Sequence, residues 1–178
     1  KAHPGQLSFG SSGNGSGSHL ATELFKLEAH IDMLHIPYKG TAPVMTDLMA
    51  GRVQLMLNSM GTVIQHVRSG KLVGLAVGTL TRSPAAPDIP TMMEAGLPQY
   101  NVSSWYGVHA PAKVSKEIVA KLNAEINKAL SKPDVKEQLF KQGVEAQVMT
   151  TADFTKYVRA EVAKMGRIIK ASGAKAEQ

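Results

Sequence analysis

Residues 9–20, FGSSGNGSGSHL, concentrate the groups that could bind a ligand: hydroxyls, an amide, an imidazole and several glycines. A short β-type run, QLSF, precedes them, and the apolar helical pattern of HLATELFKLEAH follows, with Ser16 or Ser18 as its expected N-cap. Such a strand-to-helix turn offers backbone N–H groups and the positive end of the helix dipole to an anion. The sequence therefore predicts a carboxylate or other anion cradle, with a ligand-free flexible turn as the alternative.

The same turn formally contains a hydrolase motif. The run from Gly13 to Gly17, GNGSG, matches the G-x-S-x-G pattern that places a serine nucleophile between a strand and a helix. A triad also needs an acid and a histidine, and no acidic partner is evident for His66 or His109. A hydrolase using Ser16, with His19 or His109 as base, remains an alternative from another functional class.

Other catalytic and cofactor chemistry finds little support. No two of the six histidines have metal-ligand spacing, and the absence of cysteine excludes thiol chemistry and disulfides. The turn has neither a Walker loop's lysine nor dinucleotide-binding spacing. We therefore predict no enzyme activity, no metal and no cofactor. His19 either caps a helix or faces solvent, or it donates to a ligand.

Composition bounds the partners. A net charge of +6 suits anions, but the lysines and arginines are scattered, which argues against a nucleic-acid surface. No apolar run is long enough to span a bilayer. The chain opens with KAHPGQ, which resembles neither an initiator methionine nor a signal peptide, so we expect a fragment of a longer protein.

The predicted elements alternate in the first part of the chain. Strands are expected at residues 6–10, 32–38, 53–58 and 72–78, with helices at 19–30, 42–51 and 62–70 between them. The apolar run at 72–78 is typical of a strand covered on both faces. This order predicts βαβ units around a mainly parallel sheet.

From Ser115 the chain is predicted to be mostly helical. Helices are expected at residues 115–130, 133–143 and 151–172, capped by Ser115 and Thr151 where hydroxyls precede the apolar periods, with a short strand at 144–149. The first of these helices has an apolar stripe of Ile118, Leu122, Ile126 and Leu130.

Several segments in order resemble one family. The chain is similar to the Bug family, the extracytoplasmic substrate-binding proteins of tripartite tricarboxylate transporters, from about Pro4 to the last helix. The segments that carry the resemblance are LSFGSSGNGSGSHLATELF, IPYKGTAPVMTDLMAGRVQLMLNS, GKLVGLAV, RSPAAPDIPTMMEAGLPQY and SSWYGVHAPA.

The resemblance implies an α/β fold of the type II periplasmic-binding-protein kind. It has two lobes, each with a mixed, mostly parallel sheet and flanking helices, and it is truncated here at the N-terminus. Residues 1–103 would form the ligand-binding second lobe, 104–114 a strand crossing between lobes, and 115–178 the helical C-terminal part of the first lobe. The start of the first lobe and the export signal would be absent from this chain.

The resemblance also implies ligand-binding positions, in three loops after strand ends and on the crossing strand. They are Ser11, Ser12, Gly13, Asn14, Gly15, His19, Tyr38, Lys39, Gly40, Thr41, Asn58, Ser59 and Trp105. Loops that follow the carboxyl ends of strands are where open α/β sheets bind ligands.

Four of these positions have ordinary structural roles as alternatives. Lys39 could be a solvated turn charge and Tyr38 could pack under its loop. Asn58 could cap the following helix, and Trp105 could brace the hinge between lobes.

The function implied is a periplasmic solute receptor. It would bind a small carboxylate, such as a di- or tricarboxylate, an amino acid or an aromatic acid, by cleft closure, and present it to integral-membrane transporter subunits. Besides the hydrolase, the other alternative is a truncated fragment that binds no ligand and self-associates as a homodimer through swapped or exposed first-lobe elements.

Overall fold

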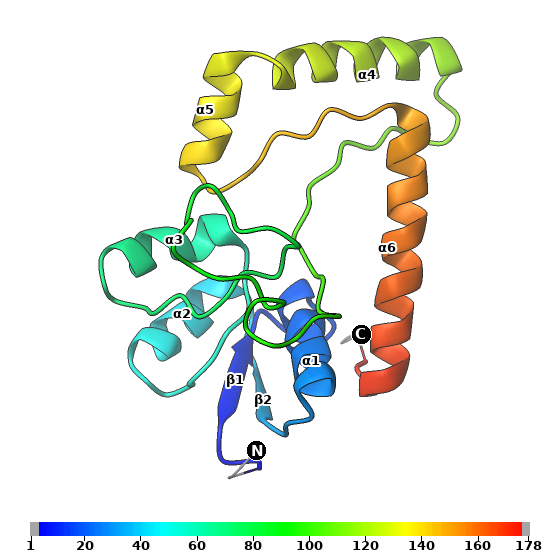
Figure 1. Cartoon of the computed structure of the whole chain (residues 1–178). Coiled ribbons are helices and arrows are strands. Elements are labelled where there is room, and N and C mark those ends of the chain that lie inside the picture. Colours follow the sequence, from blue (N-terminus) through cyan, green and yellow to red (C-terminus); the bar gives the residue numbers. More distant parts are fainter. Residues whose placement is uncertain (1–3, 176–178) are drawn as a thin grey trace. The chain divides into compact units, whose positions relative to one another are not determined.

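The computed structural model describes residues 4–175, which form two compact units (Figure 1). Of the described residues, the first unit comprises 4–104 together with 164–175. The second comprises Trp105–Ala163. The helix α6 (Thr151–Ser172) begins in the second unit and ends in the first.

The first unit is built on a β-α-β motif. Strands β1 (Ser8–Ser11) and β2 (Leu34–Pro37) pair in parallel, with Ser8 opposite Leu34 and Ser11 opposite Pro37, and α1 (Gly17–Ala29) connects them. Helix α1 packs on β1, as does α2 (Thr41–Met49). The α/β class and the parallel pairing predicted from the sequence are confirmed.

The helix ends follow local chemistry. Ser16 is the N-cap of α1, and its side chain accepts from the His19 amide. Helix α2 ends one residue before Ala50, and Gly51 then adopts a φ of 73°, a value that glycine reaches without steric cost. Helix α3 (Met60–Arg68) is likewise followed by Gly70 at a φ of 72°.

Two predicted strands of the first unit do not form ladders. At residues 53–58 only Leu55 makes a β-bridge, to Phe9, although the Gly10 amide also donates to the Leu55 carbonyl at 2.9 Å. At residues 72–78 only Val77 makes a bridge, to Thr91.

The expectation that residues 72–78 are covered on both faces is wrong within the described chain. Val73 is 81% exposed and Leu75 is 65% exposed, because no described element packs over their side chains. Apolar side chains make burial of a segment favourable, but burial occurs only where neighbouring elements pack against it.

The core of the first unit lies where the helices meet β1. Phe9 and Val44 are fully buried, and Val53, Ile64 and Tyr100 are nearly so. The Tyr100 hydroxyl donates to the Ala21 carbonyl at 3.0 Å, which ties residues near 100 to α1. Burial raises the pKa of this phenol.

The second unit holds α4 (Lys116–Leu130), α5 (Pro133–Lys141) and the start of α6. Ser115 caps α4 as predicted, because its Oγ accepts from the Ile118 amide at 3.3 Å. Thr151 was expected to cap α6, but this prediction is wrong. The Oγ1 of Thr150 accepts from the Asp153 amide at 3.1 Å and donates to the Asp153 carboxylate at 2.7 Å, so the cap lies one residue earlier.

The apolar stripe of α4 is present, but its side chains are not buried. No residue of α4 or α5 is buried, and Ile118 and Leu122 are 54% and 47% exposed. The predicted strand at residues 144–149 does not form; within it the Met149 carbonyl accepts instead from the side-chain amides of Asn123 and Asn127. A strand needs a neighbouring strand to pair with, and the described residues supply none there.

Candidate functional site

The turn between β1 and α1 is held together by its own side chains. Gly13 and Gly15 adopt φ values of 132° and 73°. The Ser12 amide donates to Ser18 Oγ at 3.0 Å, and the Gly15 amide donates to His19 Nδ1 at 3.0 Å. The Ser11 hydroxyl donates to the Gly13 carbonyl at 3.2 Å.

The sequence predicted unpaired amides at the start of the helix. The serines and His19 bond the amides of Ser12, Gly15 and His19. Among the hydrogen bonds described for the turn, none uses the amides of Gly17 and Ser18 in the first turn of α1. Those two amides are therefore the donors that the start of α1 offers to an anion, whereas the serine hydroxyls bond within the turn.

A second predicted loop adjoins the turn, as the shared sheet edge requires. The Tyr38 amide donates to the Ser11 carbonyl at 3.0 Å, and the Gly40 amide donates to the Ser12 carbonyl at 3.2 Å. Gly40 has a φ of 100° and precedes Thr41, the first residue of α2. Residues 11–15 and 38–41 thus adjoin after the ends of β1 and β2, and of these residues Ser11 is fully buried.

The side chains of the second loop divide by role. The Tyr38 hydroxyl donates to Asp47 Oδ2 at 2.7 Å, and Arg52 Nη1 contacts Asp47 Oδ1 at the same distance. The carboxylate raises the pKa of Tyr38, and the phenol and guanidinium together lower the pKa of Asp47. Tyr38 therefore braces its loop against α2, whereas Lys39 is exposed.

The remaining predicted positions lie apart from these contacts. Asn58 Oδ1 accepts from the Ser59 amide at 2.8 Å, and Ser59, not Asn58, is the N-cap of α3. Trp105 lies in the second unit, where it makes edge contacts with Phe154 at 5.9 Å and Tyr157 at 5.6 Å between ring centroids. No described hydrogen bond joins Asn58 or Ser59 to the turn.

One residue beside the turn was missed by the sequence analysis. His35 on β2 places Nε2 2.6 Å from Ser11 Oγ, and its ring stacks on His19 at 3.9 Å and on Phe9 at 4.7 Å. Burial, then the charges of His19 and Lys26, lower the pKa of His35 to about 4. The sequence offered one signal for His35: it lies on the predicted strand at residues 32–38, which was expected to pair in parallel near the strand that precedes the turn.

These contacts do not support a hydrolase. Ser16 Oγ serves the helix cap, and its described side-chain neighbour is Ser18 Oγ at 3.1 Å rather than an imidazole. Ser11 does meet an imidazole, but Ser11 is fully buried. An imidazole whose pKa is lowered to about 4 is also a weak general base at neutral pH.

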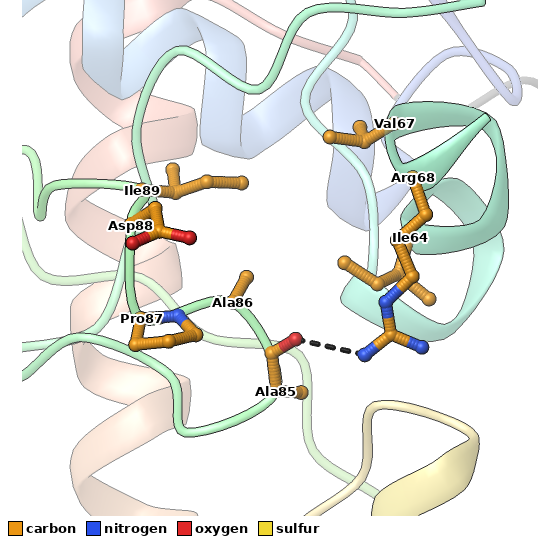
Figure 2. A pocket seen from close by; sticks show the side chains of 8 residues that line it. All are labelled: Ile64, Val67, Arg68, Ala85, Ala86, Pro87, Asp88 and Ile89. Carbon is orange, nitrogen blue, oxygen red and sulfur yellow. Dashed lines mark hydrogen bonds between the residues drawn. The ribbon is translucent and has the colours of Figure 1, made fainter. Parts of the chain in front are cut away.

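A separate pocket of about 350 Å³ lies between α3 and the loop at residues 85–89. Figure 2 shows Arg68 reaching across it to donate to the Ala85 carbonyl at 2.9 Å. The other lining side chains are apolar except Asp88, whose charge opposes an anion. The lining residues are Ile64, Val67, Arg68, Ala85, Ala86, Pro87, Asp88 and Ile89.

Residues 4–175 hold no group of three or more His, Asp or Glu side chains arranged to bind a metal ion. None of their helices combines the length and the apolar character that crossing a bilayer requires.

Comparison with known proteins agrees with the fold. Residues 1–174 match the model of the tripartite tricarboxylate transporter family receptor. Protein BugT of Bordetella pertussis is 38% identical over 176 residues, covering 98% of this chain and 54% of BugT. The chain thus spans about half of this relative's length.

Two solved structures from Rhodopseudomonas palustris share the fold. Rpa4515, solved with adipate, is 34% identical with a TM-score of 0.89, over 99% of this chain and 59% of that one. MatC, solved with bound malate, is 30% identical with a TM-score of 0.80, over 93% of this chain and 57% of that one. The chain therefore belongs to the tripartite tricarboxylate transporter receptor family, the Bug family, as the resemblance predicted.

Proposed function

We propose that the chain binds a small carboxylate through the surface formed by residues 11–18 and 38–41. One observation carries this proposal. The two loops after β1 and β2 are joined by backbone hydrogen bonds, and they contain hydroxyls, amides and Lys39 but no carboxylate side chain. Such a surface favours an anion that accepts several hydrogen bonds.

Adipate and malate are the acids to try first, because the two structures described above were solved with them. Both are small dicarboxylates, and neutral donors with bridging waters can hold such ligands. Asn58, Ser59 and Trp105 remain proposed contacts from the resemblance, with His19 acting through the turn.

The wider role follows from the family. We place the protein outside the cytoplasmic membrane, as a periplasmic receptor that presents its ligand to integral-membrane transporter subunits. Residues 1–103 would be the second lobe, 104–114 the crossing strand and 115–178 part of the first lobe. Ligand contacts with both lobes would then favour a closed form. This role requires no catalysis and no cofactor.

The test is the thermal unfolding of the chain with adipate, malate and a panel of other carboxylic acids. One acid should raise the midpoint in a saturable way, since a ligand bound only by the folded state stabilises it. Lys39→Ala should weaken binding several-fold through lost charge attraction, whereas Lys71→Ala, an equal change of charge at another exposed lysine, should not. If no acid shifts the midpoint, the proposal fails for this chain.

A further inference from the structure

We propose that His19 and His35 act together as positioning residues, holding the turn at residues 11–18 in its binding conformation through a stacked pair of neutral rings. This inference rests on the proposed function only for what the turn binds. The pair joins two elements, because His19 belongs to α1 and His35 to β2.

The rings form a tight stack on the sheet. The centroids of His19 and His35 lie 3.9 Å apart at an interplanar angle of 11°. Phe9 continues the stack from β1, 4.7 Å from His35 at an angle of 16°. His19 is 6% exposed and Phe9 is fully buried, so packing restrains the His19 ring, whereas the half-buried His35 is held by the stack and by its bond to Ser11.

Each imidazole bonds a different part of the turn. His35 Nε2 meets Ser11 Oγ at 2.6 Å, at the end of β1, and Ser11 itself donates to the Gly13 carbonyl. His19 Nδ1 accepts from the Gly15 amide at 3.0 Å. Gly13 and Gly15 are the two positions where the turn adopts positive φ. The pair therefore holds both of the turn's left-handed residues.

The bond to Gly15 also dictates a protonation state. An imidazole nitrogen accepts a hydrogen bond only when it carries no proton, so the neutral His19 must hold its proton on Nε2. That atom faces Glu23 at 3.8 Å, and Lys26 pairs with the same carboxylate at 3.0 Å. A proton on Nδ1 would remove the bond to Gly15 and bring two charged rings together if His35 were protonated as well.

The electrostatic surroundings agree with this geometry. Burial lowers the pKa of His19. The negative charge of Glu23 raises this pKa, and the positive charge of Lys26 lowers it further, but burial has the largest effect. The pKa of His35 is lowered for the same leading reason. Both rings are therefore neutral at pH 7, where a carboxylate ligand is ionised.

The decisive experiment is nitrogen-15 NMR of the 178-residue chain from pH 8 to pH 4. We expect His19 as the neutral Nε2–H tautomer at pH 8, and we expect the Gly15 amide resonance to move when His19 is protonated. A Nδ1–H tautomer, or a Gly15 amide that ignores the titration of His19, would overturn the proposal. This readout does not depend on any ligand.

Binding of adipate at pH 7.5 supplies the second readout. His35→Phe keeps a flat ring on His19 but removes the bond to Ser11, so we expect the Gly13 amide to shift and affinity to fall about fivefold to tenfold. His30→Asn removes an exposed histidine whose left-handed backbone (φ 50°) suits asparagine, and it should change neither readout. Unchanged affinity and amides in His35→Phe would overturn the positioning role.

Failure of the two ideas can be told apart. If the His19 tautomer and the Gly15 titration are as expected while neither adipate nor malate binds, the positioning of the turn stands and the proposed ligand class is wrong. If adipate binds while His19 titrates without moving Gly15, the ligand class stands and the role of the pair is wrong.

Discussion

At the residue scale, Gly10 marks the closest approach of β1 to α2. A Cβ at this position would overlap Val44 Cγ2 and would lie 3.4 Å from Tyr38 Cε2 and Val53 Cγ2. Val44 is fully buried, so its side chain has little room to move. The glycine is therefore required by packing, since its φ is not among the positive ones.

Gly10→Ala should lower the free energy of unfolding by about 1–3 kcal/mol, because an overpacked core must shift to admit the methyl group. Urea denaturation followed by circular dichroism measures this change. The control is Gly17→Ala in the first turn of α1, where a Cβ meets nothing within 4 Å and where alanine should be neutral or slightly stabilising. Equal effects of the two substitutions would contradict the packing argument.

A second prediction at this scale concerns the caps. Ser16→Ala should cost about 0.5–2 kcal/mol of stability, because the His19 amide loses its acceptor. Ser115→Ala, which removes the same kind of cap from α4, is the matched control in the other unit and should leave adipate affinity unchanged. Ester hydrolysis should remain at the buffer rate in both variants. If the unaltered chain hydrolyses an ester and Ser16→Ala abolishes this activity, the hydrolase alternative is restored.

At the scale of elements, α6 supplies the aromatic centre of the second unit. Phe154 lies edge-on to Trp105 and 5.4 Å from the ring of His109, and a Cβ at Gly107 would overlap its ring. Trp105 is the chain's single tryptophan, so its fluorescence reports on this unit.

Phe154→Leu should shift the Trp105 emission to the red and lower the stability of the second unit by about 0.5–1.5 kcal/mol, because the edge contact is lost. Fluorescence during urea denaturation gives both quantities. Phe140→Leu is the control, since Phe140 on α5 is 40% exposed and makes no ring contact among those described. An emission maximum that does not move in Phe154→Leu would show that this contact does not shield the indole.

At the scale of the whole molecule, the histidine pair makes stability depend on pH. The pKa of His35 falls from its ordinary 6.5 to about 4 on folding, so between these values the unfolded chain binds more protons than the folded chain. The contribution of His35 to the free energy of unfolding is therefore fully present above about pH 6.5, and it decreases as the pH falls toward 4. After a discount for solvent screening, the decrease is on the order of 1–2 kcal/mol.

Unfolding midpoints measured from pH 8 to pH 3 test this expectation. His35→Phe should flatten the decrease between pH 6.5 and pH 4, while His30→Asn should leave it unchanged. Below pH 4 both variants should still lose stability, because the lowered pKa values of Asp47 and Glu94 add carboxylate contributions that vanish in acid. If the stability of His35→Phe decreases by the same amount between pH 6.5 and pH 4, the decrease comes from groups other than His35.

Much of the local structure was predictable because its causes lie within a few residues. Ser16 and Ser115 bond amides three positions ahead, so the caps of α1 and α4 follow from the residue types alone. The adjoining loops after β1 and β2 were also predictable, because parallel strands place their carboxyl ends at one edge. Thr150 rather than Thr151 caps α6 since neighbouring hydroxyls compete, and composition does not rank them.

The sequence by itself therefore determined the α/β class, the family, the main helices and the polar turn. Only the tertiary structure decided which residues contact that turn. The bond between Ser11 and His35 joins residues 24 apart, and it depends on the register of β1 with β2. The tertiary structure likewise decided that Val73 and Leu75 are exposed within this chain, and that the apolar stripe of α4 is not buried. A periodic pattern states which face can be buried, but burial requires a neighbour, and neighbours are set by long-range packing.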